Sequence, residues 1–494
     1  MLTTHACNTL NRLLEPRLTP LALALALALA LAANPAQAVV CDANGVGGDG
    51  GSTDDGFASA FACGINNNLF GAPAGPGSSA VGYLNTASGI QSSALGRLNT
   101  ASGTNSSAVR RSNTASGTTS SAVGRANTAS GESSSALGFF NTASGPDSSA
   151  VGSSNTASGH NSSALGHSNT ASDPSSSALG YFNTASGLAS SAVGSGNTAS
   201  GVASSAVGRQ NLASGRNSSA VGAFNTASGE SSSAVGLSNA ASGVRSLAMG
   251  VQSSTGTGAA SSIAIGDTAV VGGNAVSAIA IGTNANAQSS NAIAIGTGAV
   301  AVNSTSIAIG AGARAVSSVA VGVGAQATGL NSTAIGDNAT ASGNFAVAVG
   351  NNATASHTNA VAIGNGSLTS SANSVSVGFA GGERTIQNVA PGVAGTDAVN
   401  VDQFNAAFSS VNSAIGRVEK LASRGTAVAL ASVQALPALA PGETGVGIGA
   451  GNYNGESAIG LSLGHAVTNN LMLSAGVATS GGKTGTRIGL GYKF

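Results

Sequence analysis

Hydrophobic and polar positions repeat along this chain with a period of fourteen residues. An Ala-Val-Gly triplet at 80–82 returns as Ala-Leu-Gly at 94–96, and thirteen Ala-apolar-X triplets at this interval end at 248–250. Asn-Thr-Ala-Ser runs between the triplets, so the consensus unit is S-S-A-[V/L]-G-x-x-N-T-A-S-G-x-x. A fixed short period predicts a solenoid, in which each coil buries its apolar face only against its neighbours.

A second repeat block, residues 251–378, follows the first block at 78–250 and carries [I/V]-A-[I/V]-G units. Its closing glycines are mostly fourteen residues apart, with one interval of sixteen and one of twelve, which predicts small loop insertions and deletions. Alternation places Ile263 and Ile265 on one side of a strand and Ala264 on the other. Asn and Gly tolerate tight corners, so two short strands per coil are predicted, with the Asn amides stacked from coil to coil.

The two blocks are expected to differ inside. The first has Ser121 where the second has Ile263, when both are aligned on the following glycine, so its coils would be more polar in the interior or arranged differently. Both faces of so thin a roll carry small apolar residues. A lone chain would then expose an Ala-rich face, which association of several chains would bury.

A heptad pattern after the repeats predicts parallel association through a coiled coil. Apolar residues recur at spacings of three and four, at Val401, Phe404, Phe408, Val411, Ile415, Val418 and Ala422. This a/d seam of about three heptads says little about the number of chains. The Ala-rich segment 426–440 follows, and its small residues would let three such helices pack together in a narrow lumen.

The last fifty residues contain four alternating segments of about ten residues, the length of a tilted membrane β-strand. The final apolar face consists of Ile488, Leu490, Tyr492 and Phe494. Four strands cannot close a barrel, and lipid does not tolerate an open sheet edge, so the strands must be shared between chains. Two chains would give eight strands and a lumen filled by side chains, whereas three would give twelve with room inside, which favours a trimer.

The N-terminal 38 residues are typical of an export signal. Arg12 and Arg17 precede a Leu/Ala run, and Ala-Gln-Ala at 36–38 fits the small-x-small cleavage rule. The sequence predicts no fold for residues 39–77. Cys41 and Cys63 would remain in the mature chain in an oxidising compartment, where a disulfide is predicted and two unpaired thiols are the alternative.

Composition argues against an ordinary globular core and against an enzyme. Glycine supplies 73 of 494 residues, aromatics 3% and charged residues 7%, with zero net charge. Nucleic-acid binding therefore has no electrostatic support. Glu132 and Asp147 are predicted neighbours but form a solvated surface pair, and His160 and His167 are half a coil apart. No catalytic residue, cofactor site or metal site is predicted. Arginines outnumber acids in the first block, where a trimeric ring could attract acidic glycans or simply maintain solubility.

With these features in place, the chain resembles the YadA-like trimeric autotransporter adhesins over nearly its whole mature length. The coils resemble the family's head repeats. Ser-Val-Ser-Val-Gly at 374–378, Arg-Thr-Ile-Gln-Asn-Val at 384–389 and Thr-Asp-Ala-Val-Asn-Val-Asp-Gln at 396–403 resemble its neck, with Phe404 in place of the usual Leu. Arg-Gly-Thr-Ala at 424–427 and the strands ending Tyr-Lys-Phe resemble its membrane anchor.

The resemblance implies a mostly β protein with a trimeric left-handed parallel β-roll head, a short neck and coiled-coil stalk, and a 12-stranded transmembrane β-barrel shared by three chains. Its parts would be a signal peptide, an irregular N-terminal segment, two head blocks, a neck, a stalk and an anchor, at 1–38, 39–77, 78–250, 251–378, 379–403, 404–424 and 425–494.

The resemblance also implies a function. The homotrimer would reach the outer membrane through the periplasm with the outer-membrane assembly machinery, contact outer-membrane lipid and export its passenger through the barrel. It would attach to host matrix proteins, cells or surfaces and cause autoagglutination. Coils resembling the family's collagen-binding repeats contain Asn291, Ile293, Ile295, Asn303, Ile307 and Ile309. A passive spacer or protective coat is the alternative. Ice binding through a Thr column at 86, 100, 114 and 128 is a distant third, and an enzyme is least expected.

Overall fold

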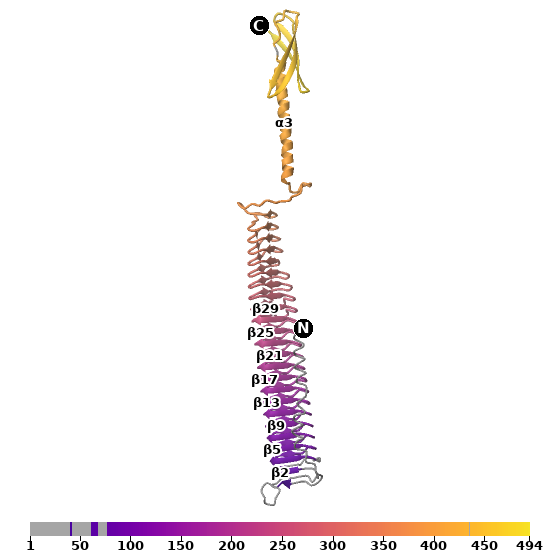
Figure 1. Ribbon diagram of the computed structural model, residues 1–494, viewed down its shortest axis with the longest axis vertical. Coiled ribbons are helices and arrows are strands. Elements are labelled where there is room, and N and C mark those ends of the chain that lie inside the picture. Colours follow the sequence, from indigo (N-terminus) through magenta and orange to yellow (C-terminus); the bar gives the residue numbers. More distant parts are fainter. Residues whose placement is uncertain (1–39, 42–60, 68–76, 434) are drawn as a thin grey trace. The chain divides into compact units, whose positions relative to one another are not determined.

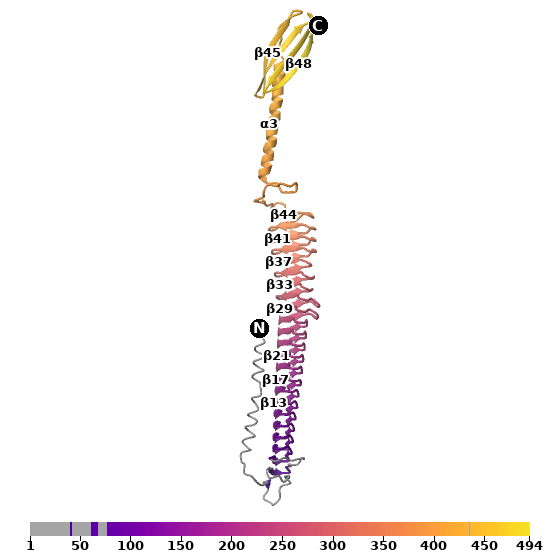
Figure 2. The same cartoon turned by 90° about the vertical axis from the view of Figure 1, so that its right-hand side faces the viewer.

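The structure is a computed structural model that describes residues 40–41, 61–67, 77–433 and 435–494. The chain divides into two compact units, residues 1–384 and 385–494. In the first unit the chain winds into a stack of coils, each with one long and one short strand (Figures 1 and 2). This arrangement confirms the predicted solenoid with two strands per coil.

The strands follow the sequence period. From β3 (Ser79–Tyr83) to β27 (Leu247–Val251), odd-numbered strands have five residues and begin every fourteen residues. From β4 (Thr86–Ala87) to β28 (Ser254–Thr255), even-numbered strands have two residues and the same period. The long strands that follow are β29 (Ile263–Asp267), β31 (Ile279–Ile281), β33 (Ile293–Ile295), β35 (Ile307–Ile309), β37 (Val319–Val321), β39 (Thr333–Ile335), β41 (Val347–Val349), β43 (Val361–Ile363) and β44 (Val375–Ser376). The short strands that follow are β30 (Val270–Val271), β32 (Asn286–Ala287), β34 (Val300–Ala301), β36 (Arg314–Ala315), β38 (Gln326–Ala327), β40 (Thr340–Ala341) and β42 (Thr354–Ala355).

Each strand pairs in parallel register with the equivalent strand of the next coil, so the stack has a long-strand sheet and a short-strand ladder. Register is kept where the repeat length changes. Ile263 pairs with Ile279 across an interval of sixteen, and Ile307 pairs with Val319 across an interval of twelve. The extra and missing residues therefore fall in the corners, as predicted.

Alanine fills the interior of the stack. Ala122 of β9 (Ser121–Arg125) and Ala129 of β10 (Thr128–Ala129) are both 0% exposed, and the equivalent alanines of other coils are equally buried. Val123, next to Ala122, points outward and is half-buried. The expectation of an exposed Ala-rich face is therefore wrong. Alanine faces inward on each long strand, and the alternating Val, Leu and Ile residues form an outer column.

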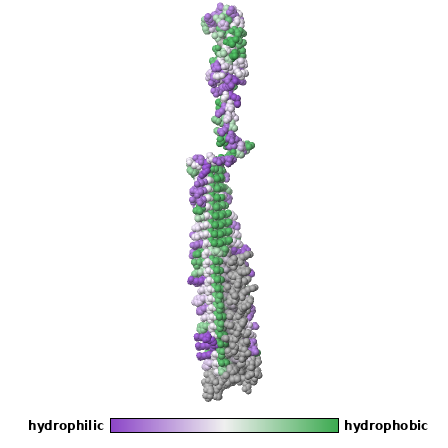
Figure 3. Space-filling view, viewed as in Figure 1, coloured by the Kyte–Doolittle hydropathy of each residue, from purple (hydrophilic) through white to green (hydrophobic). Residues whose placement is uncertain are grey.

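This outer column gives the long-strand sheet a continuous apolar stripe, which we call the apolar face. It contains one column in the first block, at Val123 and its equivalents, and two in most coils of the second block, at Ile263 and Ile265 and their equivalents. The stripe accordingly broadens over the second block in the space-filling view (Figure 3). Ser121 and Ile263 both lie on this outer surface, so the expected effect of that exchange on the interior is wrong.

The interior of the first block is nevertheless the more polar, because it holds an asparagine ladder where the second block has Ala269 and its equivalents. The Asn141 Oδ1 atom accepts hydrogen bonds from the backbone N–H and the Nδ2 atom of Asn155, both at 3.0 Å. Asn155 Nδ2 also donates to the carbonyls of Val151 and Gly166, at 2.9 and 2.7 Å. The contacts repeat from Asn67 to Asn239, which confirms the predicted amide stacking.

A glycine follows the outer Val or Leu in almost every coil because the backbone there is left-handed and tightly stacked. Gly152 has φ +120°, and a Cβ atom on it would lie 2.0 Å from the carbonyl oxygen of Gly166. Arg110 occupies this position in its own coil with φ +91°. A side chain in this region strains the backbone, so Arg110 sits at a cost to stability.

Arg110→Gly is accordingly expected to stabilise the head by about 1 kcal/mol, since relief of the strain exceeds the entropy that glycine adds to the unfolded chain. Thermal unfolding of the full-length protein measures the shift. Arg111→Gly is the matched control, because it removes the same charge from the following residue. An unchanged or lower midpoint for Arg110→Gly would contradict the strain.

The segment 39–77 contributes two described strands, β1 (Val40–Cys41) and β2 (Phe61–Ile65). Strand β2 pairs with β3, so it extends the long-strand sheet, and β1 pairs with β2. Cys41 and Cys63 are register partners in that pair, a placement compatible with a bridge between neighbouring strands. The side chain of Cys41 and the export signal at 1–38 lie outside the described residues, so the disulfide and the signal stay predictions.

The second unit contains helix α3 (Val401–Ser432) and four antiparallel strands: β45 (Thr444–Tyr453), β46 (Glu456–Ala466), β47 (Leu471–Ser480) and β48 (Lys483–Tyr492). Asn400 and Gln403 form a capping box at the helix start, where Asn400 accepts from the Gln403 amide. The seam and the start of the Ala-rich segment form one uninterrupted helix. It ends at Ser432 rather than continuing to Ala440, because Pro437 cannot supply the next turn's amide.

Candidate functional site

The four C-terminal strands carry an apolar outer face. Ile488, Leu490, Tyr492 and Phe494 are 88%, 69%, 59% and 106% exposed. Two of the tight turns between the strands are built as hairpin turns require: Asn454-Gly455 and Gly481-Gly482 all have positive φ. The sheet therefore presents a continuous apolar surface, with the paired rings of Tyr492 and Phe494 at its end, 5.2 Å apart.

The inner face of the same sheet is small, and helix α3 packs against it. Ala427, Val428 and Ala431 of the helix are buried there with Ala458 and Ala478 of the strands. Glycines on this face make the approach possible. A Cβ atom on Gly451 would lie 2.5 Å from the Ala427 carbonyl oxygen, and one on Gly485 would lie 2.7 Å from the Val428 side chain. The inner face of small residues that the sequence predicted is thus the surface on which the chain's own helix packs.

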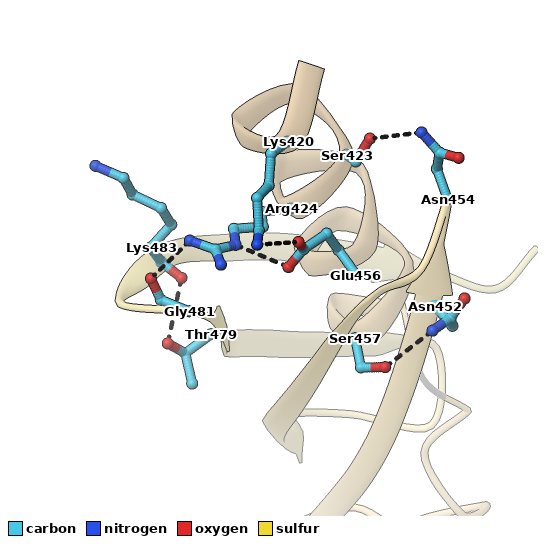
Figure 4. A network of polar contacts seen from close by, with 10 residues as sticks. All are labelled: Lys420, Ser423, Arg424, Asn452, Asn454, Glu456, Ser457, Thr479, Gly481 and Lys483. Atoms are coloured by element: carbon cyan, nitrogen blue, oxygen red, sulfur yellow. Dashed lines mark hydrogen bonds and ion pairs between the residues drawn. The ribbon is translucent and has the colours of Figure 1, made fainter. Parts of the chain in front are cut away.

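A polar network joins helix α3 to the ends of the strands (Figure 4). Arg424 donates from Nε to Glu456 Oε2 at 2.8 Å, and Lys420 Nζ lies 3.3 Å from Glu456 Oε1. Arg424 also reaches the Gly481 carbonyl, at 3.4 Å, in the turn between β47 and β48. One arginine therefore joins the helix to both hairpins. The sequence did not predict these contacts, because Glu456 and Gly481 lie 32 and 57 residues after Arg424 and follow no period.

The predicted seam lies along one side of α3 with its side chains exposed. The exposed fractions lie between 55% and 72% for Val401, Phe404, Phe408, Val411, Ile415 and Val418. The rings of Phe404 and Phe408 stack with centroids 6.1 Å apart. A helix with a stripe of large exposed apolar residues, and no contact of its own to cover it, has the surface that a coiled coil requires.

The neck begins where Arg384 closes the last coils of the head. The Arg384 guanidinium donates to Ser367 Oγ at 2.9 Å and to the carbonyls of Asn365 and Val377. Farther along, in the second unit, Asp397 Oδ2 accepts from the backbone amides of Val393 and Ala394, both at 2.8 Å. These two amides, Ala394 more strongly, lower the pKa of Asp397 because they stabilise its charged form.

The Asp397 turn is therefore expected to depend on pH. A lowered pKa in the folded state means that the carboxylate stabilises the turn above its ordinary pKa of about 4. This contribution is lost as pH falls through the lowered pKa. Amide hydrogen exchange should show protection of Val393 and Ala394 at pH 6 that declines below pH 4. Asp397→Asn should remove this pH dependence, and a protection that stays equal at both pH values would contradict it.

The candidate ligand coils lie in the second block, on β33, β35 and the corners before them. Ile293, Ile295, Ile307 and Ile309 belong to the apolar face, and Ile309 is 37% exposed. Asn291 and Asn303 are exposed at the corners, where Asn303 Nδ2 donates to Ser317 Oγ of the next coil at 2.7 Å. The structure thus separates the set into four residues on the apolar face and two on the flank.

Glu132, Asp147 and His160 lie on the surface of successive coils. Asp147 follows Glu132 in the next coil, where its amide donates to the Glu132 carbonyl at 2.7 Å, and its carboxylate lies 3.8 Å from His160 Nε2. Within the part of the chain that the structure describes, no group of three His, Cys, Asp or Glu residues is placed to hold a metal ion. None of the described helices is long and apolar enough to cross a membrane.

Comparison with known proteins covers all three parts. Residues 437–494 match the YadA-like membrane anchor domain, and residues 385–427 match the coiled stalk of trimeric autotransporter adhesin. The YadA head domain repeat matches segments between residues 74 and 379. One similar solved structure, the collagen-binding domain of the Yersinia adhesin YadA, is 28% identical, with 41% of this chain and 86% of that chain covered and a TM-score of 0.22. With the repeats, stalk helix and strand anchor all matched in order, this chain belongs to the YadA-like trimeric autotransporter adhesins and is anchored in the outer membrane with its passenger at the cell surface.

Proposed function

We propose that three copies of this chain assemble in parallel and that the trimer attaches the cell, through many weak contacts, to matrix proteins, host cells or other surfaces, and to other cells of its kind. The observation that carries this proposal is the unpartnered apolar surface on each part of the chain. The apolar face of the head is partly exposed in the single chain, and the seam of α3 and the outer face of the anchor sheet are exposed.

The packing of α3 against the inner face of the four strands supports three copies rather than two. Each chain places its own helix against the inner face of its four strands. An eight-stranded barrel from two chains is filled by side chains and has no room for helices, whereas twelve strands from three chains enclose a wider lumen. Three helices with small residues at Ala427 and Ala431 would occupy it. The same lumen would have passed the passenger during export.

A trimer also changes which residues a ligand can reach. We propose that Ile293, Ile295, Ile307 and Ile309 pack between chains, because burial of an apolar column stabilises association. Contact with a ligand would then fall to Asn291 and Asn303 on the exposed corners. Each contact is shallow, but three chains repeat it, and multivalency raises the overall affinity without a deep pocket.

The seam gives a direct test of assembly. Phe408→Asp is expected to lower the temperature at which the trimer dissociates, since three carboxylates would meet at one layer of the coiled coil, while the single chain keeps its fold because Phe408 is 56% exposed. Semi-native electrophoresis of the full-length protein shows the trimer band. Ser410→Asp, which places the same residue on the outward side of α3, should leave the trimer intact. A trimer band that is lost at the same temperature in Phe408→Asp and in the wild type would contradict the proposed seam.

Adhesion is tested with the full-length protein displayed on cells that lack other adhesins. Binding to immobilised collagen, fibronectin, laminin and bare polystyrene is compared for the wild type and a variant without residues 283–310. This deletion removes two coils, including both candidate corners, and joins equivalent positions of the stack. The matched control lacks residues 139–166, two coils of the first block.

Saturable binding to one protein that is lost with 283–310 and kept without 139–166 would support the proposal. Equal binding to every surface, or to none, would favour a passive spacer or protective coat, a function that the near-identical coils also suit. Membership of an adhesin family suggests a structural or binding role rather than catalysis.

A further inference from the structure

One corner of the first block gathers arginine and aromatic side chains on successive coils. Tyr83, Arg97, Arg111, Arg125 and Phe139 are the last residues of β3, β5, β7, β9 and β11. Each is the register partner of the next, so the five side chains form one column with a spacing of about 4.8 Å per coil. We call the three arginines of this column, together with the adjacent Arg110, the basic ridge.

The structure places no described carboxylate against the charges of the basic ridge. All four arginines are exposed, and like charges on neighbouring strands repel each other. Among the described residues, no ion pair involves any of them. The acids of the first block lie in the corners that follow the short strands, whereas the basic ridge lies in the corner that follows the long strands. These acids are Glu132, Asp147, Asp173 and Glu230.

Arg110 adds a second, independent observation. It stands at the glycine position of its coil, between Gly96 and Gly124 in register, with φ +91°. The backbone of this coil is thus strained at a position where the neighbouring coils have glycine. The strained residue adds a fourth guanidinium, next to Arg111 in the sequence. Strained residues of this kind concentrate at binding sites, where the function of the side chain offsets their cost in stability.

Aromatic rings close both ends of the basic ridge. The Arg97 guanidinium lies 5.4 Å from the centre of the Tyr83 ring, and the Arg125 guanidinium lies 5.2 Å from that of Phe139. These cation–π contacts hold the end arginines in place and leave N–H donors free for a ligand. Phe140, edge-on to Phe139 at 4.3 Å, is 53% exposed and widens the flat apolar surface beside the charges.

We propose that the basic ridge binds an acidic polysaccharide, a sugar chain that carries carboxylate or sulfate groups. Guanidinium groups bind such anions through paired N–H donors, and a row of them suits a polymer with regularly spaced charges. The exposed faces of Phe139 and Phe140 would pack against the C–H faces of the sugar rings. The site lies in the first block, so it is separate from the coils of 283–310 and does not depend on them.

Two other occupants fit less well. The phosphates of duplex DNA wind around the helix axis, one per about 3.4 Å of axis on each strand, so a straight row of arginines at about 4.8 Å per coil meets few of them in succession. A second copy of this chain offers Glu132 and Asp147 on adjacent coils, and Asp147 already lies 3.8 Å from His160 Nε2. Among the described head coils, these two carboxylates on adjacent coils do not balance four arginines.

The test uses the purified full-length protein in detergent and heparin as the probe, immobilised on a sensor surface. Arg97→Ser, Arg111→Ser and Arg125→Ser are combined, because Ser153 occupies the same corner position in β13 (Ser149–Ser153) and shows that the coil accepts serine. Binding at physiological salt is expected to weaken at least about tenfold in this variant, with a smaller dependence on salt.

The control variant carries Arg209→Ser, Arg216→Ser and Arg245→Ser, which removes the same charge elsewhere in the first block. It should bind heparin within about twofold of the wild type. Arg110→Gly distinguishes loss of binding from loss of folding, because this variant is expected to be more stable than the wild type and yet to bind more weakly. Its lower affinity can then come only from the missing guanidinium.

The proposal is overturned if the wild type does not bind heparin, or if the ridge and control variants weaken equally. It is also overturned if duplex DNA or polyglutamate binds as tightly as heparin, since the surface would then recognise charge alone. Absence of heparin binding together with loss of cell–cell aggregation in the ridge variant would assign these arginines to a contact between copies of this chain.

Discussion

Replacing Asn155 with alanine is expected to lower the free energy of unfolding of the head by at least about 3 kcal/mol per chain. The amide of Asn155 serves three coils at once. It donates to Asn141 Oδ1 of the preceding coil and to the carbonyls of Val151 and Gly166, and its Oδ1 atom accepts from the backbone and side chain of Asn169. Asn155 is 0% exposed, so water does not replace these bonds and several buried polar groups lose their partner.

Thermal or denaturant unfolding of the full-length protein, followed by far-ultraviolet circular dichroism, measures this effect. Ser158→Ala is the matched control, since it is a substitution three residues away in the same coil whose side chain is exposed. An Asn155→Ala protein that unfolds with the wild type would show that the ladder does not stabilise the stack.

In the second block, alanine occupies the position equivalent to Asn155, and a backbone hydrogen bond explains why it is tolerated. The Ala299 amide donates to the carbonyl of Gly296, within its own corner, at 3.2 Å, whereas the Asn155 amide depends on the side chain of Asn141. Backbone closes the corner in one block, and an asparagine side chain closes it in the other. The prediction for Asn155 therefore applies to the first block, where removal of the side chain leaves the corner open.

The period of the sequence was enough to predict the coils, their register and the stacking of the asparagines, because each of these follows from the repeat alone. The period did not predict which side of the long strand faces inward. Val and Ile are more often buried than Ala, yet Ala122 is inside and Val123 outside. Which side of the long strand faces inward is a property of the closed coil rather than of either strand.

The anchor shows the same limit. Alternation predicted four strands with an apolar outer face, since the pattern is local. The contact of Arg424 with Glu456 and Gly481 joins residues far apart in the sequence, and no pattern links them. The basic ridge was partly visible as an excess of arginine in the first block. Its gathering on one corner becomes apparent when residues are aligned on the fourteen-residue period.

Replacing Gly451 with valine is expected to prevent assembly of the anchor. A Cβ atom at this position would lie 2.5 Å from the carbonyl oxygen of Ala427 and 2.7 Å from the amide nitrogen of Ala431. Both are backbone atoms of α3, so the helix must move as a whole, and overpacking of this kind costs about 3 kcal/mol or more per chain. If three chains share one lumen, each displaced helix also disturbs the other two.

Surface display measures the outcome, with an antibody to the head on intact cells and semi-native electrophoresis for the assembled anchor. Ala450→Val is the matched control, because Ala450 is the preceding residue of β45 and is exposed on the outer face, where a larger apolar side chain meets no backbone. Display should fall at least about tenfold for Gly451→Val and stay unchanged for Ala450→Val. Normal display of Gly451→Val would mean that α3 does not remain against Gly451 in the assembled anchor. The argument for three chains, which rests on the packing of this helix against the strands, would then fail as well.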